Sequence, residues 1–170
     1  HFPGHGGIKE DSHITEPIDT RSKDDLIDND LKPFIELKDK LSAVMTAHIT
    51  YPDIDNVCVS FSEIWLKNIL QKNIGFNGVI FSDDLTMKGA GNISMDEKAI
   101  KALNAGCDMV LVCNDYKEAN SVINRFEKED IDLNSRIGMM QKTKTFNWED
   151  LADNPRVIET KQIIKTLGEI

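Results

Sequence analysis

The sequence predicts an α/β fold built around a parallel sheet. Three short apolar runs occur at residues 43–48, 78–83 and 108–113, and none of them alternates between apolar and polar positions. Such runs are typical of strands that are buried on both faces, as in parallel sheets. Stretches with helical spacing of apolar residues separate the runs, so helix and strand alternate along the chain. The 170 residues are too few for a complete eight-fold βα barrel, which needs about 250.

In the sequence, the first two predicted helices come before and after the first predicted strand. One covers about 22–40, and Pro33 is expected to kink or divide it; its apolar positions are Leu26, Ile27, Leu31, Ile35 and Leu37. The other covers 60–73, because Ser60 and Glu63 have the spacing of a capping box and Gly75 is a typical helix stop.

The later helices follow the second and third strands. The spacing predicts a helix over 95–105, with a capping box from Ser94 to Glu97, and another over 115–128. Helical stretches at about 132–143 and 156–167 close the chain. No linker, low-complexity segment or internal repeat is visible, so the sequence indicates one structural unit.

Composition narrows the classes of partner. The chain has 20 Lys and Arg against 29 Asp and Glu, a net charge of −9, which argues against nucleic acid and anionic membranes as partners. No apolar run approaches the length of a membrane span. The three cysteines are widely spaced and form no CxxC pair, so buried, inert thiols are favoured over a zinc site; they are Cys58, Cys107 and Cys113.

The candidate chemical residues are those at the carboxyl ends of the predicted strands, where βα proteins place their sites. This rule selects Thr46, His48, Ser82, Asp83, Asp84, Cys113, Asn114 and Asp115. A glycine-rich segment at 1–7 also opens the chain and leads to Asp11-Ser12-His13.

Two carboxylate arrangements carry chemical meaning. Asp83 and Asp84 are adjacent on a strand and point in opposite directions, so at most one faces a site as a nucleophile, base or metal ligand. A helix cap or surface turn explains them equally well. Asp11 stands two residues from His13 and can accept a hydrogen bond from one ring nitrogen, which fixes the tautomer and raises the pKa of the imidazole. A solvated loop is the alternative.

Metal and phosphate sites are disfavoured. His1 and His5 have the spacing of helical metal ligands, and His13, His48 and Asp11 could join them, but Pro3 and the surrounding glycines oppose a helix there. The glycine-rich start could bind a phosphate through backbone N–H groups, yet it matches neither common phosphate-binding pattern. We expect no metal and no cofactor.

Several motifs in order resemble the family 3 glycoside hydrolases, and more narrowly the NagZ-type β-N-acetylhexosaminidases. They are HFPGHG at 1–6, DSH at 11–13 and GVIFSDDLTM at 78–87. The segments MTAH at 45–48, YP at 51–52 and AGCDMV at 105–110 are also similar to that family. The resemblance is strongest over 1–116.

The resemblance implies a (β/α)8 TIM barrel, of which this chain covers roughly the last four βα units and C-terminal helices. Residues 1–170 are then a partial catalytic domain without its N-terminal half. The implied mechanism is retaining: Asp83 is the nucleophile, His13 the general acid/base, Asp11 its orienting partner and His1 a sugar contact. The family's lysine before this histidine would lie before residue 1. Asp84 is expected to be structural, and Gly6 and Gly7 to let the His13 loop move as a lid.

The family's usual substrate is the N-acetylglucosaminyl-anhydromuramyl peptide of peptidoglycan recycling, which is handled in the bacterial cytoplasm. Two alternatives stay open. A histidine acid/base leaves less negative charge near the anomeric carbon, so phosphate could replace water and make the protein a phosphorylase. Alternatively, the chain is an inactive half-barrel that pairs with itself or requires a partner half, because a half-barrel exposes two sheet edges.

Overall fold

The computed structural model describes residues 1–129, 135–141 and 147–168. The chain divides into two compact units, 1–140 and 141–170, and each is described by itself. This differs from the single structural unit that the sequence indicates, because nothing in the composition marks a boundary there. The second unit contains α5 (Trp148–Ala152) and α6 (Pro155–Leu167), and α6 confirms the helix expected at 156–167.

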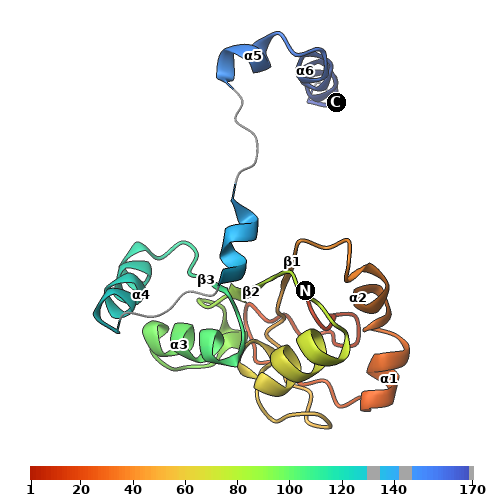
Figure 1. Ribbon diagram of the computed structural model, residues 1–170, viewed down its shortest axis with the longest axis vertical. Helices are drawn as coiled ribbons and strands as arrows, with labels where there is room; N and C mark the ends of the chain where they lie inside the picture. The colour runs from red at the N-terminus through yellow and green to blue at the C-terminus, as the bar shows by residue number, and fades with distance from the viewer. Residues whose placement is uncertain (130–134, 142–146, 169–170) are drawn as a thin grey trace. The chain divides into compact units, whose positions relative to one another are not determined.

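The first unit is built on a three-stranded parallel sheet, which confirms the α/β class. Its strands are β1 (Ala43–Met45), β2 (Val79–Asp84) and β3 (Met109–Leu111), in the order β1-β2-β3. The β1 side of the sheet is flanked by α1 and α2, and the β3 side by α3 and α4 (Figure 1).

The start of the chain adds a further extended segment to this sheet. The N–H of Phe2 donates to the carbonyl of Met45 at 2.7 Å, and the N–H of Ala47 donates to the carbonyl of Phe2 at 2.8 Å. The N–H of Thr46 points the other way and donates to Phe81 of β2. Phe2 therefore pairs with the edge of β1 that β2 leaves open, and His1 is brought to the carboxyl end of the sheet.

Pro33 divides the first helical region, as expected. Helix α1 (Lys23–Asp28) is capped by the Ser22 side chain, which accepts from the N–H of Asp25 at 3.1 Å. Helix α2 (Lys32–Leu37) has Pro33 in its first turn, where the missing N–H of proline costs no helical hydrogen bond.

The helix expected over 60–73 differs from the prediction in form and in its cap. A short 3₁₀ turn, η1 (Val59–Phe61), is followed by the π-helix η2 (Ile64–Asn73). Ser62 rather than Ser60 receives the N–H of Trp65, at 3.1 Å. Ser60 is buried and bonds to other buried side chains. The capping-box spacing was therefore a coincidence, although Gly75 does follow the helix, with φ of 81°.

The remaining helices of the first unit follow β2 and β3 in the sequence. Helix α3 (Met95–Ala105) has the predicted bounds, but the side chain of Ser94 makes no capping bond. The unit also contains η3 (Lys88–Ala90), α4 (Tyr116–Glu129) and η4 (Ser135–Met140). The 3₁₀ turn η4 takes the place of part of the helix expected at 132–143, and a bend at Gln141 follows it; residues 132–134 and 142–143 of that stretch lie outside the described residues.

Two hydrophobic clusters pack against residues that lie next to the strand ends. The Trp65 ring lies 5.8 Å from that of Phe2 and 5.2 Å from that of Tyr51, measured between centroids. A second cluster joins buried Leu85, just after β2, to Ala99 of α3 and Val122 of α4. The residues before Phe2 and before Leu85 are therefore attached to packed, fixed positions.

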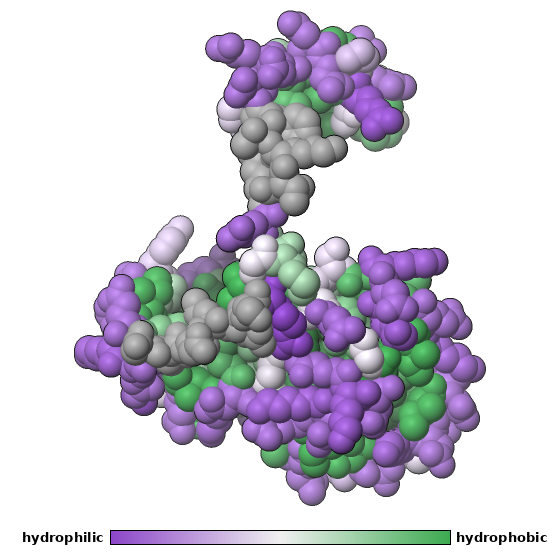
Figure 2. Space-filling model, viewed as in Figure 1, coloured by the Kyte–Doolittle hydropathy of each residue, from purple (hydrophilic) through white to green (hydrophobic). Residues whose placement is uncertain are grey.

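The outer surface is mostly hydrophilic on the face seen in Figure 2, and hydrophobic residues are visible beside α1. Ile27 and Ile35, from α1 and α2, are partly exposed. Among the helices that the structure describes, none combines the length and apolar character needed to cross a bilayer.

Candidate active site

A β-bulge places Asp83 at the end of β2. Phe81 pairs with Met109 and Asp84 pairs with Leu111, so β2 has one more residue than β3 between these pairs. The Ser82 hydroxyl accepts the N–H of Leu111 at 3.0 Å and so replaces a backbone acceptor within the bulge. Bulges redirect side chains beside functional sites, and this one lies at Ser82 and Asp83.

Asp83 and His1 come together at this edge. The Oδ2 atom of Asp83 lies 3.5 Å from Nε2 of His1, with the side chains 14% and 50% exposed respectively. The N–H of Asp84 donates to the Oδ1 atom of Asp83 at 2.8 Å, so the adjacent peptide orients the carboxylate. The result is an accessible carboxylate that faces a histidine from the neighbouring segment.

The Asp84 carboxylate has a separate, structural set of partners, as expected. Its Oδ1 atom accepts from the N–H groups of Thr86 and Cys113, each at 3.0 Å, and Oδ2 accepts from the Thr86 hydroxyl at 2.7 Å. Partial burial opposes ionisation, but these hydrogen bonds outweigh it and lower the pKa of Asp84. Asp84 thus ties the turn after β2 to the end of β3.

His48 is buried beneath the edge. Its Nε2 atom lies 3.0 Å from the carbonyl of Asp84, and Nδ1 lies 2.9 Å from the Ser60 hydroxyl. A carbonyl only accepts, so Nε2 carries the proton and Nδ1 accepts from Ser60. Burial lowers the pKa of His48, which keeps the ring neutral. His48 is therefore a support for the Asp84 backbone.

Asp11 and His13 form the predicted dyad. The Nδ1 atom of His13 lies 2.7 Å from Oδ1 of Asp11, and the His13 N–H donates to the same oxygen at 2.9 Å. These two hydrogen bonds lower the pKa of Asp11. The side chains are 71% and 57% exposed for His13 and Asp11. With Nδ1 engaged by the carboxylate, Nε2 is the ring atom that can exchange a proton with a substrate.

Gly89 connects the loop that carries Asp11 and His13 (the dyad loop) to the turn that follows Asp83. Its N–H donates to the carbonyl of Ser12 at 2.8 Å, and the N–H of Lys88 points to the carbonyl of His13 at 3.4 Å. A Cβ at position 89 would lie 2.8 Å from the Cβ of His48 and 3.0 Å from the Ser12 carbonyl. Only glycine permits this approach, and nothing in the sequence pattern singled it out.

The glycines at the start of the dyad loop differ in their surroundings. A Cβ at Gly7 would overlap the Arg21 guanidinium, whereas nothing lies within 4 Å of one at Gly6. Arg21 donates to both Asp19 and Asp30, at 2.8 and 2.7 Å. Gly7 is needed for packing on this ion-pair cluster, and Gly6 has the open surroundings that a hinge requires.

The other sequence candidates do not join the site. All three cysteines are free thiols; Cys107 is buried as expected, whereas Cys58 and Cys113 are half-buried. Burial raises the pKa of Cys58 to about 11, which keeps this thiol protonated. Cys113 contributes its backbone N–H to Asp84. Within the described ranges, no three metal-binding side chains come together.

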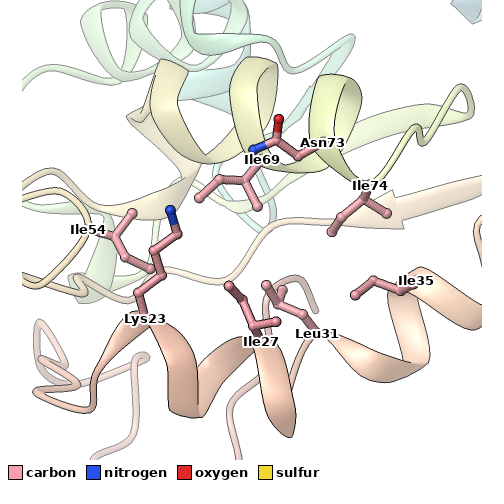
Figure 3. Close-up of a pocket in the computed structure, with 8 residues that line it drawn as sticks. All are labelled: Lys23, Ile27, Leu31, Ile35, Ile54, Ile69, Asn73 and Ile74. Carbon is pink, nitrogen blue, oxygen red and sulfur yellow. The ribbon is translucent and has the colours of Figure 1, made fainter.

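An apolar cavity of about 220 Å³ lies away from these residues. Figure 3 shows Ile27 and Leu31 facing Ile69 of η2 across it. Neither carboxylates nor histidines line it, so it lacks the groups that glycoside chemistry or proton transfer needs. The chemically equipped surface is the sheet edge at Asp83.

Comparisons with known proteins point to one family. The model of the glycosyl hydrolase family 3 N terminal domain matches residues 1–139. A protein named Beta-hexosaminidase from Actinobacillus pleuropneumoniae serotype 3 is 42% identical over 172 residues, which cover 98% of this chain and 50% of that protein. One of the same name from Idiomarina loihiensis is 51% identical over 124 residues, covering 72% of this chain and 38% of its own length.

Solved structures agree with this result. The native NagZ of Neisseria gonorrhoeae matches with a TM-score of 0.70 and 43% identity, over 85% of this chain and 42% of that one. A family 3 β-N-acetylglucosaminidase from Paenibacillus matches with a TM-score of 0.73 and 26% identity, over 94% of this chain and 34% of that one. The chain spans about half the length of the first curated relatives it matches. It belongs to the glycosyl hydrolase family 3 N-terminal domain family.

Proposed function

We propose that the full-length protein carrying these residues is a retaining β-N-acetylhexosaminidase. The observation that carries the proposal is a hydrogen-bonded link between the two segments that hold the candidate groups. The oriented carboxylate of Asp83 ends β2, and the Asp11–His13 dyad is bound by Gly89 to the turn directly after it. A nucleophile and a proton-transfer group are the two parts that a double-displacement glycosidase needs. The relatives named Beta-hexosaminidase support the choice of sugar.

In the first step, an oxygen of Asp83 attacks the anomeric carbon of the terminal sugar. The bond from this carbon to the leaving oxygen breaks, and its electron pair goes to that oxygen. The Nε2 proton of the His13 imidazolium passes to the same oxygen, so a neutral alcohol departs and the sugar remains as an ester of Asp83.

In the second step, the now neutral His13 takes a proton from water as that water attacks the anomeric carbon. The ester bond breaks, the Asp83 carboxylate is restored, and two inversions give overall retention. Asp11 stabilises the imidazolium through its bond to Nδ1. His1, beside Asp83, is placed to bind a sugar hydroxyl.

The proposed substrate is the N-acetylglucosaminyl-anhydromuramyl peptide of peptidoglycan recycling, in the bacterial cytoplasm. Bacterial relatives named Beta-hexosaminidase and the NagZ structures support this choice. The reaction removes the terminal N-acetylglucosamine.

We also propose that the catalytic pocket is completed by an N-terminal half of a (β/α)8 barrel. In the described part of the chain, one sheet edge is formed by the Phe2 segment and the other by β3. Relatives about twice as long support a further half that pairs with these edges. The 170-residue chain alone is then expected to release no sugar. Release at the rate of the full-length protein would contradict the need for a second half.

The experiment that tests the function is hydrolysis of a chromogenic N-acetyl-β-glucosaminide by the full-length protein, followed by NMR. The β-anomer of N-acetylglucosamine should be the first product. First appearance of the α-anomer would exclude retention, and no release would exclude the activity. Turnover that requires phosphate and yields a sugar phosphate would establish the phosphorylase instead.

A further inference from the structure

Lys98 of α3 is buried within the layer below the candidate active site. Among the described residues, it is the one buried lysine. Burial of an ammonium group is costly unless a specific partner compensates it. Here the Nζ atom donates to the carbonyl of Leu85 at 2.8 Å. Leu85 itself is fully buried and lies two residues after Asp83.

The peptides on either side of Leu85 are held by other groups. The N–H of Leu85 donates to Leu111 at 2.9 Å, and the N–H of Met87 donates to the carbonyl of Asp84 at 3.1 Å. That carbonyl also receives Nε2 of His48. Two buried side chains, His48 and Lys98, therefore hold the successive carbonyls of Asp84 and Leu85.

This backbone orients Asp83 directly. The N–H of Asp84 donates to the Oδ1 atom of Asp83. A shift of the Asp84–Leu85 backbone would move that donor and turn the carboxylate.

The charge of Lys98 is favoured by nearby carboxylates. Desolvation lowers the pKa of Lys98, while the charges of Asp84, Glu16 and Glu118 oppose this effect and favour the ammonium form.

We propose that Lys98 is a positioning residue that holds the Asp83 carboxylate in its reactive orientation through the carbonyl of Leu85. The inference rests on the proposed function, in which Asp83 is the nucleophile. Lys98 touches neither substrate nor reacting atoms. Lys98 acts on the reaction indirectly: it fixes the Leu85–Thr86 peptide, two peptides along the chain from the Asp83–Asp84 peptide whose N–H orients the carboxylate.

The test compares three variants of the full-length protein. Lys98→Met keeps the aliphatic stem and removes the donor, Lys98→Arg keeps a cationic donor, and Lys101→Met is the matched control from the exposed face of the same helix. Because a misplacement of about 1 Å costs about 10²-fold in rate, we expect kcat of Lys98→Met to fall by about that factor. KM should change little, Lys98→Arg should recover most of the rate, and Lys101→Met should equal the parent.

Hydrogen exchange at the amides of Leu85, Thr86 and Met87 provides a readout independent of activity. We expect faster exchange there in Lys98→Met, measured below its melting transition, and parent-like exchange in Lys101→Met. Parent-like kcat and exchange in Lys98→Met would overturn the proposal, as would equal losses in Lys98→Arg. If the parent releases no sugar, the proposed function fails, while the exchange data still decide whether Lys98 holds the turn.

Discussion

The Nε2 atom of His1 lies 3.5 Å from the Oδ2 atom of Asp83, although the two residues belong to different segments of the sheet. The contact depends on the pairing of Phe2 with β1 and on the bulge at the end of β2. It places a hydrogen-bonding ring beside the carboxylate that we propose as the nucleophile.

His1→Ala should weaken binding of the sugar more than it slows chemistry. The loss of one ordinary hydrogen bond predicts a rise in KM of about three- to tenfold. Steady-state kinetics with a chromogenic N-acetylglucosaminide would measure it. His5→Ala, which removes an exposed histidine of the same segment, is the control. A loss confined to kcat would assign His1 to the transition state instead.

His13→Ala should harm substrates with poor leaving groups more than those with good ones. A good leaving group departs without a proton, whereas a sugar alcohol needs the imidazolium. General acid catalysis contributes about 10² to 10⁴-fold, so we expect a loss of that size for the disaccharide and a much smaller one for an aryl glycoside. Equal losses for both substrates would argue against His13 as the acid.

Gly89→Ala should displace the dyad loop. The added Cβ would meet the Cβ of His48 and the carbonyl of Ser12 at 2.8 and 3.0 Å. We expect reduced kcat and a lower melting temperature. Gly138→Ala is the matched control, because nothing lies within 4 Å of its Cβ. If Gly89→Ala kept both the activity and the melting temperature of the parent, the close approach of Gly89 to Ser12 and His48 would matter for neither.

Stability should depend on pH through His48. Burial holds the folded-state pKa of His48 below its ordinary value of 6.5, so the folded state resists protonation. The contribution of neutral His48 to the free energy of unfolding is complete above pH 6.5 and is lost as the pH falls toward the folded-state pKa. Each proton involved changes the unfolding free energy by about 1.4 kcal/mol per pH unit. Urea unfolding between pH 7 and 5 should show this slope in the parent and a shallower one in His48→Gln; parallel profiles would contradict it.

Local sequence patterns predicted most helices, but they did not predict the long-range contacts that shape the site. The spacing of apolar residues located α3, because this helix buries one face that includes Ala99, Ala102 and Ala105. Helix α6 was also located, although it buries no residue; the Asn154 cap and Pro155 mark its start. The bulge at Ser82–Asp83 arises from pairing with β3, which no local pattern reports. The N–H of Trp65 in η2 donates to the hydroxyl of Ser62 rather than to that of Ser60, which bonds to Thr46 and His48 instead.

The site residues illustrate the same difference. Asp11 and His13 are close in sequence, so their hydrogen bond is predictable from spacing alone. Their roles, and those of Asp83 and His1, came from the family resemblance. Gly89 and Lys98 were missed, because each acts through a carbonyl distant in sequence, at Ser12 and at Leu85.

The role of Asp83 is the central claim, and mass spectrometry tests it most directly. The full-length protein would be treated with an N-acetylglucosaminyl fluoride carrying fluorine at C5, which slows hydrolysis of the ester, and the labelled peptide would be sequenced. We predict one added sugar on Asp83 and no label in Asp83→Asn, while Asp84→Asn still labels at position 83. A sugar bound to another residue, or labelling of Asp83→Asn at the parent rate, would contradict the account.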